Sequence, residues 1–150
     1  MCGLCGVLTL DGAPAALPAL EAMNACLAHR GPDQGRALAL GACGLANRRL
    51  AVLDLSPAAA LPMQSADGTI TVAYNGEIYN HLALRPALEA RGHSFRTTSD
   101  VETLIALYRE HGPAFVEHLR GMFAVALWDA PRGRLVLARD RLGEKPPYLV

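Results

Sequence analysis

The sequence predicts an α+β fold in which antiparallel sheets are covered by helices. Segments with strand character come in pairs and runs, and segments with helical spacing lie mostly in the middle of the chain. The chain lacks the regular strand–helix–strand alternation and the glycine-rich phosphate loop of a doubly wound parallel sheet. Because 51% of the 150 residues are apolar, we expect one domain with one core.

Charge and hydropathy exclude several classes of partner. The formal net charge is zero and the arginines are scattered, whereas a nucleic acid or an anionic membrane surface calls for a clustered basic face. No apolar run approaches the roughly 20 residues of a membrane-spanning helix. The N-terminus lacks the charged and apolar regions of a signal peptide. We therefore expect a cytoplasmic protein without a nucleic-acid or membrane partner.

The first half of the chain alternates apolar segments with turns. Leu17–Arg30 has apolar residues at near-helical spacing and ends at Gly31-Pro32, which predicts a helix. Asn75-Gly76 is typical of a hairpin turn, but the segment that follows has helical character, so we expect this pair between a strand and a helix. The other predicted elements here are the strands Leu4–Leu10, Ala37–Leu45, Leu50–Leu53 and Thr69–Tyr74, the surface loop Ser56–Ser65 and the turn Asp67-Gly68.

The second half is predicted to be helical first and then stranded. Ser99 and Glu102 have the spacing of a capping box, which opens a helix that runs through Glu110. The other predicted elements are the helix His81–Arg91, a short helix from Pro113, and the strands His93–Thr97, Met122–Trp128, Leu135–Ala138 and Tyr148–Val150.

The N-terminal Met1-Cys2-Gly3 is a candidate nucleophile. Removal of Met1 would leave Cys2 with a thiol and a free α-amine, and an amine with a pKa of about 7.7 to 8.0 can act as the base that the thiol needs. Cys2-x-x-Cys5 also has zinc or thioredoxin spacing, but no second Cys or His pair accompanies it. In a cytosolic chain we expect free cysteines and no metal.

Arg48 and Arg49 are adjacent in a predicted strand, so their side chains point to opposite faces. One of them can face solvent while the other holds a carboxylate in a two-bonded fork; an intramolecular salt bridge is the alternative. Asp100 lies in the first turn of a predicted helix, where the helix dipole alone is a sufficient reason for a carboxylate. The amide of Asn75 and the N–H of Gly76 can converge on one oxygen, as an oxyanion site requires.

Several motifs together resemble one family, the class II glutamine amidotransferase domain of the asparagine synthetase type. They occur in the order of that family from residue 1 to the end of the chain, and together they are specific. The motifs are Met1-Cys2-Gly3, Arg30-Gly31-Pro32-Asp33, Arg49-Leu50-Ala51-Val52-Leu53-Asp54-Leu55-Ser56, Tyr74-Asn75-Gly76-Glu77-Ile78-Tyr79-Asn80, Ser99-Asp100-Val101-Glu102, Arg120-Gly121-Met122-Phe123-Ala124 and Arg139-Asp140-Arg141-Leu142-Gly143-Glu144-Lys145-Pro146.

The resemblance implies a fold and a set of catalytic residues. The fold is the four-layer αββα sandwich of N-terminal nucleophile hydrolases. In this family the N-terminal cysteine, here Cys2, attacks the side-chain amide of glutamine while its own α-amine shuttles the proton. Asn75 and Gly76 are implied as the oxyanion donors. Ammonia leaves, and water then releases glutamate from the thioester.

The resemblance also implies how glutamine is recognised. Arg49 would clamp the α-carboxylate, and Asp100 with Glu77 would hold the α-ammonium, so that opposite charges meet opposite ends of the amino acid. Leu50 and Val52 complete the implied substrate-binding set. No metal or cofactor is implied for the glutaminase half.

The family context implies a longer protein. Residues 1–150 correspond to a glutaminase domain that is incomplete at its C-terminus, followed in the family by a synthetase domain that uses ATP and Mg²⁺ to make asparagine from aspartate with the ammonia. The same half-reaction could serve another acceptor, such as a natural product or a sugar, or the module could be non-catalytic; a homodimer is also possible. Asn47, Cys5 and Pro147 depart from the family pattern, with histidine common at the position of Asn47.

Overall fold

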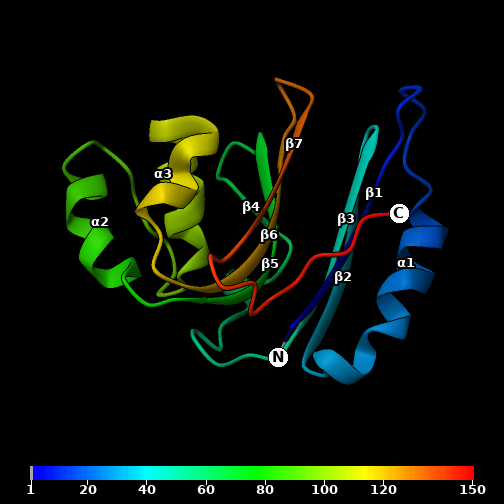
Figure 1. Ribbon diagram of the computed structural model, residues 1–150, viewed down its shortest axis with the longest axis horizontal. Coiled ribbons are helices and arrows are strands. Elements are labelled where there is room, and N and C mark those ends of the chain that lie inside the picture. The colour runs from blue at the N-terminus through cyan, green and yellow to red at the C-terminus, as the bar shows by residue number, and fades with distance from the viewer. Residues whose placement is uncertain (1) are drawn as a thin grey trace.

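The structure is a computed structural model that describes residues 2–150, and it is built of four layers (Figure 1). A three-stranded sheet and a four-stranded sheet face each other, with α1 outside the first and α2 and α3 outside the second. This arrangement confirms the predicted αββα sandwich. The helices are α1 (Leu17–Cys26), α2 (His81–Glu89) and α3 (Val101–His111), and the strands are β1 (Gly3–Leu8), β2 (Gln34–Leu40), β3 (Cys43–Arg49), β4 (Met63–Gln64), β5 (Ile70–Ile78), β6 (Gly121–Asp129) and β7 (Arg134–Arg139).

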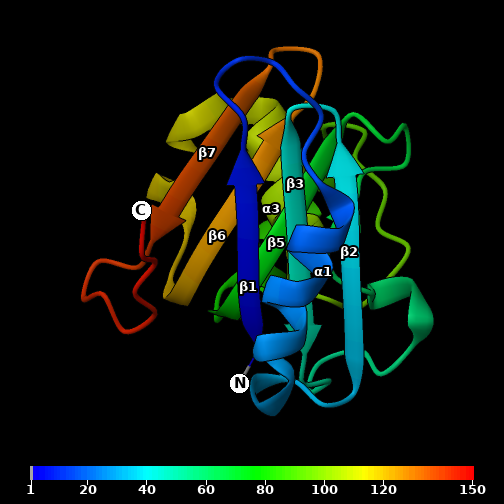
Figure 2. The same cartoon turned by 90° about the vertical axis from the view of Figure 1, so that its right-hand side faces the viewer.

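The first sheet has the order β1-β3-β2, with both pairs antiparallel. The predicted single strand Ala37–Leu45 is in fact a hairpin, because Gly41 adopts a φ of 73° and turns the chain between β2 and β3. Helix α1 covers the outer face of this sheet (Figure 2). Its helical hydrogen bonding ends at Cys26, four residues before the predicted end, and a short 3-10 turn follows at Ala28–Arg30.

The second sheet has the order β4-β5-β6-β7 and is antiparallel throughout. The prediction that Asn75-Gly76 lies between a strand and a helix is wrong. Both residues lie inside β5, opposite Ala124 and Phe123 of β6, and the strand continues to Ile78. The predicted turn at Asp67-Gly68 is confirmed, since Gly68 has a φ of 72° and joins β4 to β5.

Apolar side chains form two cores. The larger core lies between the second sheet and its helices, and it contains fully buried side chains such as Leu104, Phe115 and Leu127. The smaller core lies between the two sheets around Leu45, Ala73 and Trp128. The prediction of one core is therefore wrong: each face of the second sheet has its own apolar cluster.

Three predicted strands are absent from the described residues. Leu50–Leu53 and His93–Thr97 are irregular, and Tyr148–Val150 forms no strand. The backbone N–H groups of Arg96 and Thr97 donate to the carboxylate of Glu102, so a buried side chain takes the place of a neighbouring strand. Glu102 consequently does not close the predicted capping box.

The segment Ser56–Ser65 is only in part the predicted surface loop. It contains β4 and a 3-10 turn at Pro57–Ala59, and Ala59, Leu61 and Met63 are buried. The predicted helices at His81–Arg91 and Ser99–Glu110, the short helix from Pro113 and the strands Met122–Trp128 and Leu135–Ala138 are confirmed within a few residues. Within residues 2–150, no helix has both the length and the apolar character needed to cross a membrane.

Candidate active site

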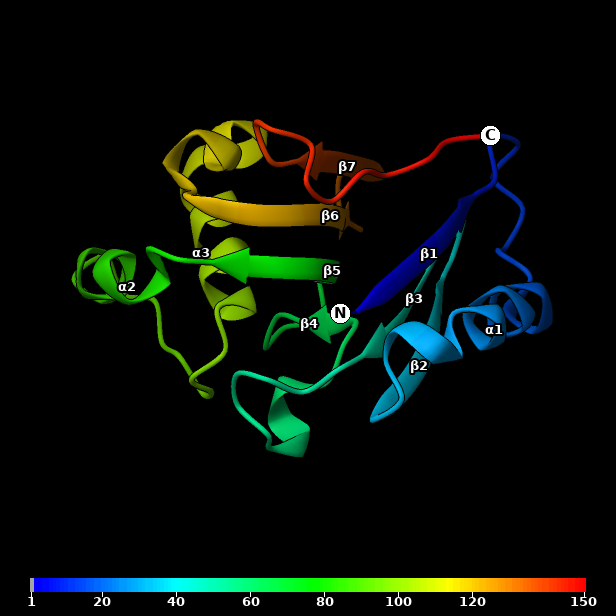
Figure 3. The ribbon, with the colours of Figure 1, turned by 60° about the horizontal axis from the view of Figure 1, so that its bottom comes forward.

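Cys2 immediately precedes β1 and faces the second sheet. Side chains alternate along a strand, and Leu4 packs in the inter-sheet core while Gly3 faces Leu27 on the outer side. Cys2, two residues before Leu4, therefore shares the inner face. Its Sγ lies 3.7 Å from the carbonyl oxygen of Leu50. Figure 3 shows this end of β1 beside β5; the expected removal of Met1 concerns a residue outside the described range.

The zinc or thioredoxin alternative for Cys2-x-x-Cys5 does not fit this strand. Cys5 is an odd number of residues from Cys2, so its side chain points to the opposite face, toward α1. Burial raises the pKa of the Cys5 thiol, and the neighbouring Cys26 thiol raises it further. All four cysteines are free, and no group of three or more metal-ligating side chains is found in residues 2–150.

One edge of β5 is open beside Cys2. Strand β4 pairs only with Thr71 and Val72, so the same edge of β5 has no partner strand beyond that point. The N–H of Tyr74 donates to Asn47 Oδ1 at 2.9 Å, and the N–H of Ile78 donates to Asp100 Oδ2 at 2.9 Å. Since backbone N–H groups alternate between the two edges of a strand, the N–H of Gly76 points to this open edge as well.

The partner of Gly76 on β6 leads to the same conclusion. Phe123 is opposite Gly76, but both its N–H and its carbonyl bond Asp140 on the other side. Gly76 and Phe123 are therefore a pair that exchanges no hydrogen bonds. A Cβ on Gly76 would lie 2.1 Å from the carbonyl oxygen of Met122, so only glycine allows β5 and β6 to be this close.

Arg49 is 8% exposed and organises the irregular segment that follows β3. Its Nη2 donates to the carbonyl oxygens of Leu53, at 2.9 Å, and of Asp54. Arg48 points the other way and donates to the carbonyl oxygen of Asn24 at 3.0 Å. The predicted opposite orientation of the two arginines is confirmed, and neither forms an ion pair with a described residue 2–150.

Asp54 fixes the far end of that segment. It has a φ of 51°, and its carboxylate accepts hydrogen bonds from Ser56 and from the N–H and hydroxyl of Thr98. These bonds, led by the one from the Ser56 hydroxyl, lower the pKa of Asp54 to about 2. Asp54 thereby ties the segment after Arg49 to the loop that leads into α3.

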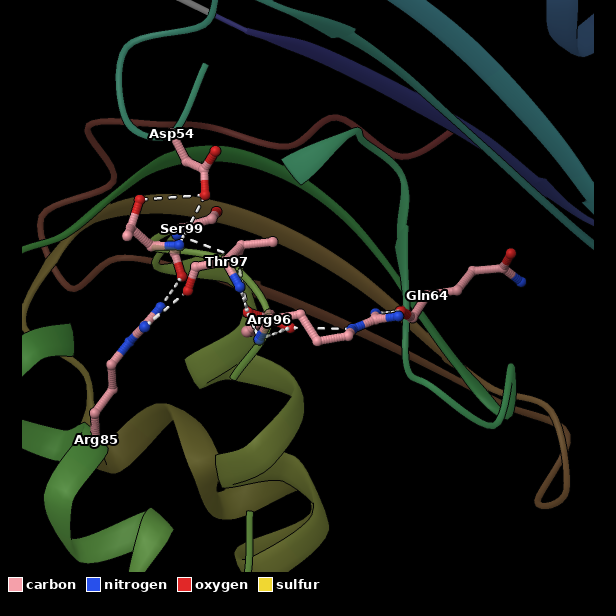
Figure 4. Close-up of polar contacts among 8 residues, drawn as sticks. Asp54, Gln64, Arg85, Arg96, Thr97 and Ser99 are labelled. Atoms are coloured by element: carbon pink, nitrogen blue, oxygen red, sulfur yellow. Dashed lines mark hydrogen bonds and ion pairs between the residues drawn. The ribbon is translucent and has the colours of Figure 1, made fainter. Parts of the chain in front are cut away.

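The loop that leads into α3 is itself held by side chains (Figure 4). Arg85 donates to the carbonyl oxygens of Thr97 and Ser99 at 2.8 and 2.6 Å. Arg96 reaches the carbonyl oxygen of Gln64 at 3.4 Å. Together with the bonds of Asp54 to Thr98, these contacts anchor the loop at three places just before Asp100.

Asp100 has a role that the helix dipole does not explain. It is 4% exposed, and its Oδ2 accepts the hydroxyl of Tyr74 at 2.7 Å as well as the N–H of Ile78. Burial raises the pKa of Tyr74, and the Asp100 carboxylate raises it further, so Tyr74 remains a hydrogen-bond donor to Asp100. Asp100 is thus fixed to the open edge of β5.

The predicted site residues line one cavity, which has a volume of about 150 Å³. A cavity of that volume can hold one small organic molecule. Basic side chains, Arg49 and Lys145, and acidic side chains, Glu77 and Asp100, both line it, as suits a zwitterion. All eight predicted site residues line this cavity: Cys2, Arg49, Leu50, Val52, Asn75, Gly76, Glu77 and Asp100.

Four residues with a structural part in this site were not predicted from the sequence. Tyr74 and Lys145 line the cavity, Asp54 fixes the segment after Arg49, and Asn47 bonds the backbone of Tyr74. Tyr74, Lys145 and Asp54 lie in the quoted motifs, which was the available signal. For Asn47 the only signal was its departure from the family pattern.

Comparison with known proteins identifies the family of this chain. Residues 1–150 match the family model described as a glutamine amidotransferase domain. An asparagine synthetase (glutamine-hydrolysing) of Bacillus subtilis is 41% identical over 152 residues, which cover 99% of this chain and 20% of that protein. Asparagine synthetase B of Escherichia coli is 40% identical over 151 residues, with 99% and 27% covered. The chain spans about a fifth to a quarter of these relatives.

A solved structure shares the fold. The glutamine phosphoribosylpyrophosphate amidotransferase of B. subtilis matches with a TM-score of 0.73 and 20% identity, over 91% of this chain and 37% of that one. The matching fold and the relatives confirm the resemblance carried by the motifs. The chain therefore belongs to the glutamine amidotransferase domain family.

Proposed function

We propose that this domain hydrolyses glutamine to glutamate and ammonia, with Cys2 as the nucleophile. Cys2 Sγ attacks the side-chain carbonyl carbon, the thiol proton passes to the α-amine of Cys2, and that amine protonates the departing nitrogen as the C–N bond breaks. Ammonia leaves and a glutamyl thioester forms; water attacks the thioester, which yields glutamate and the free thiol. No histidine lines the cavity in residues 2–150, which supports the α-amine as the base.

Two donors would stabilise the negative charge on the carbonyl oxygen. Gly76 offers its N–H at the open edge of β5, and Asn75 would add its side-chain amide from the face toward the first sheet. Donors of this kind are each worth about 2.7–4 kcal/mol in the transition state. The open edge of β5 beside Cys2 is the single observation that carries the proposal.

Charged groups on the cavity wall would select a free amino acid. In the proposal the guanidinium of Arg49 binds the α-carboxylate, and Asp100 with Glu77 binds the α-ammonium. Leu50 and Val52 would close the cavity from the segment after β3; Val52 is 71% exposed, so its side chain is available to a bound ligand. No cofactor enters these steps.

The test is the intact mass of the purified protein before and after incubation with a diazo-ketone analogue of glutamine. We expect a starting mass without Met1 and a single adduct. Cys2→Ala should abolish the adduct, whereas Cys26→Ala, which removes an exposed thiol outside the cavity, should retain it. Retention of Met1, or an adduct that persists in Cys2→Ala, would contradict the mechanism.

We further propose that the ammonia serves ATP-dependent synthesis of asparagine from aspartate in a synthetase domain of a longer protein. The names of the B. subtilis and E. coli relatives, which match over 99% of this chain, support this acceptor. ATP and Mg²⁺ belong to that second reaction. The test is to supply the full-length protein with glutamine labelled in the amide nitrogen, ATP and aspartate: label in asparagine is expected, and label in free ammonia alone would refute this acceptor.

A further inference from the structure

Asn47 joins the two sheets at the site. It lies in β3 and is fully buried. Its Nδ2 donates to the carbonyl oxygen of Gly3 at 2.8 Å and to that of Tyr74 at 2.9 Å, and its Oδ1 accepts the N–H of Tyr74 at 2.9 Å. Gly3 follows the nucleophile and Tyr74 precedes the oxyanion donors, so one side chain bonds both halves of the proposed machinery.

The side chain of Asn47 acts as a neighbouring strand for one residue of β5. Tyr74 lies past the point where β4 ends, so both its N–H and its carbonyl would lack a strand partner on that edge. The planar amide of Asn47 supplies one acceptor and one donor, as a paired peptide group would. The remaining N–H of the amide goes to Gly3, which fixes the orientation of the amide, since a flipped amide would bring its oxygen against two carbonyl oxygens.

The position of these bonds along β5 matters for the chemistry. Tyr74 and Gly76 are two residues apart on the same edge of β5. The bonds from Asn47 to Tyr74 therefore fix the position of the Gly76 N–H relative to β1. The bond from Asn47 to the Gly3 carbonyl fixes the position of Cys2, one residue away, relative to β5. The rest of the core between the sheets is a small apolar cluster around Leu45, Ala73 and Trp128.

We propose that Asn47 is a positioning residue that sets the distance between the Cys2 thiol and the oxyanion donors of β5. This inference rests on the proposed glutaminase function and adds to it a residue that does not line the cavity. It predicts a defect in the chemical step with little change in glutamine binding, since the side chains of Arg49 and Asp100 are held by bonds of their own, to the Leu53 carbonyl and from the Ile78 N–H. A misplacement of about 1 Å in such a site can cost about 100-fold in rate.

The test compares Asn47→Asp with Asn24→Asp. Both are buried asparagines that lose the same amide donor, but Asn24 lies in α1 and its amide bonds the carbonyl oxygen of Arg36, outside the cavity. For Asn47→Asp we expect glutaminase kcat to fall about 100-fold and KM to stay within about threefold. Alkylation of Cys2 by iodoacetamide, which needs no oxyanion donor, should stay within about twofold of wild type. Asn24→Asp should lower Tm but keep kcat.

A second variant guards against a folding defect. Asn47→Ser is smaller and keeps one hydroxyl, which can bond one of the three partners but cannot span all of them, so kcat should fall again at nearly constant KM. A wild-type kcat in folded Asn47→Asp or folded Asn47→Ser would overturn the proposal, and so would a loss of Cys2 reactivity toward iodoacetamide that parallels the loss of kcat. Loss of cooperative melting in both Asn47 variants, but not in Asn24→Asp, would overturn it as well. Failure of the glutaminase proposal itself is distinct: the wild-type protein would then show neither glutamine hydrolysis nor a diazo-ketone adduct.

Discussion

Gly76→Ala tests whether the close approach of β5 and β6 positions an oxyanion donor. The added Cβ would lie 2.1 Å from the Met122 carbonyl oxygen and 2.7 Å from Phe123 Cα, where real Cβ contacts stay above 3.0 Å. Both contacts are backbone atoms, so no side chain can move aside. The two strands must therefore separate by about 0.9 Å at this pair, and the Gly76 N–H moves with them.

This displacement predicts two separable effects. Strain of this kind costs about 1–3 kcal/mol of unfolding free energy, or about 2–12 °C in Tm. The shift of the donor lowers glutaminase kcat by about 100-fold, while KM stays within about threefold because Arg49 is on β3 and Asp100 keeps its bond from the Tyr74 hydroxyl. Steady-state kinetics and thermal melting measure the two effects.

The matched control is Gly44→Ala in β3. There the new Cβ would meet only side-chain atoms, Leu20 Cδ2 at 3.0 Å and Ala15 Cβ at 3.1 Å, on the side of the first sheet that faces α1. We expect a loss of Tm with unchanged kcat. A wild-type kcat in folded Gly76→Ala would refute the assignment of the Gly76 N–H as an oxyanion donor.

Two further variants probe the segment after β3. Arg49→Lys keeps the charge but loses the planar fork, so KM for glutamine should rise about 10- to 100-fold, with a smaller change in kcat; an unchanged KM in steady-state assays would argue against a carboxylate clamp. Asp54→Asn concerns a carboxylate whose pKa is lowered to about 2 by its hydrogen bonds. Because the folded-state pKa is depressed, the stabilisation is present above the unfolded-state value of about 3.9 and is lost as pH falls toward 2. The Tm difference between wild type and Asp54→Asn should accordingly be constant from pH 5 to 8 and fall to a small part of that value by pH 2, and a difference at pH 2 as large as at pH 7 would contradict a role for the ionised carboxylate.

The motifs of the sequence predicted the contents of the cavity better than its geometry. The turn preference of Asn75-Gly76 and the helical character of the segment that follows predict that the pair lies between a strand and a helix. In the structure Gly76 is required for another reason, the close contact with Met122, and the pair continues the strand. Local turn preference gives no information about which strand lies alongside, so the open edge of β5 was not predictable from these residues.

The wrong strand predictions have a common physical cause. Leu50–Leu53 and His93–Thr97 have strand-like composition, but side chains just outside each segment take their backbone groups: Arg49 binds the carbonyl of Leu53, and Glu102 binds the N–H groups before α3. Composition alone does not distinguish a strand partner from such a side chain. For β6 and β7, by contrast, the apolar pattern is sufficient to predict both strands. They follow one another in the sequence and pair with each other across a short turn.

An unpaired strand edge usually carries a risk of self-association, since another chain can add a strand to it. The edge of β5 past Val72 is shielded from this. Asn47 occupies the first position, Asp100 occupies the third, and the Leu50–Asp54 segment covers the approach. The part of this edge that is left without a partner is one peptide group long and lies at Gly76. The edge is therefore too short for a foreign strand and long enough for one amide of a small molecule, so the same contacts that form the site also protect the domain from aggregation through it.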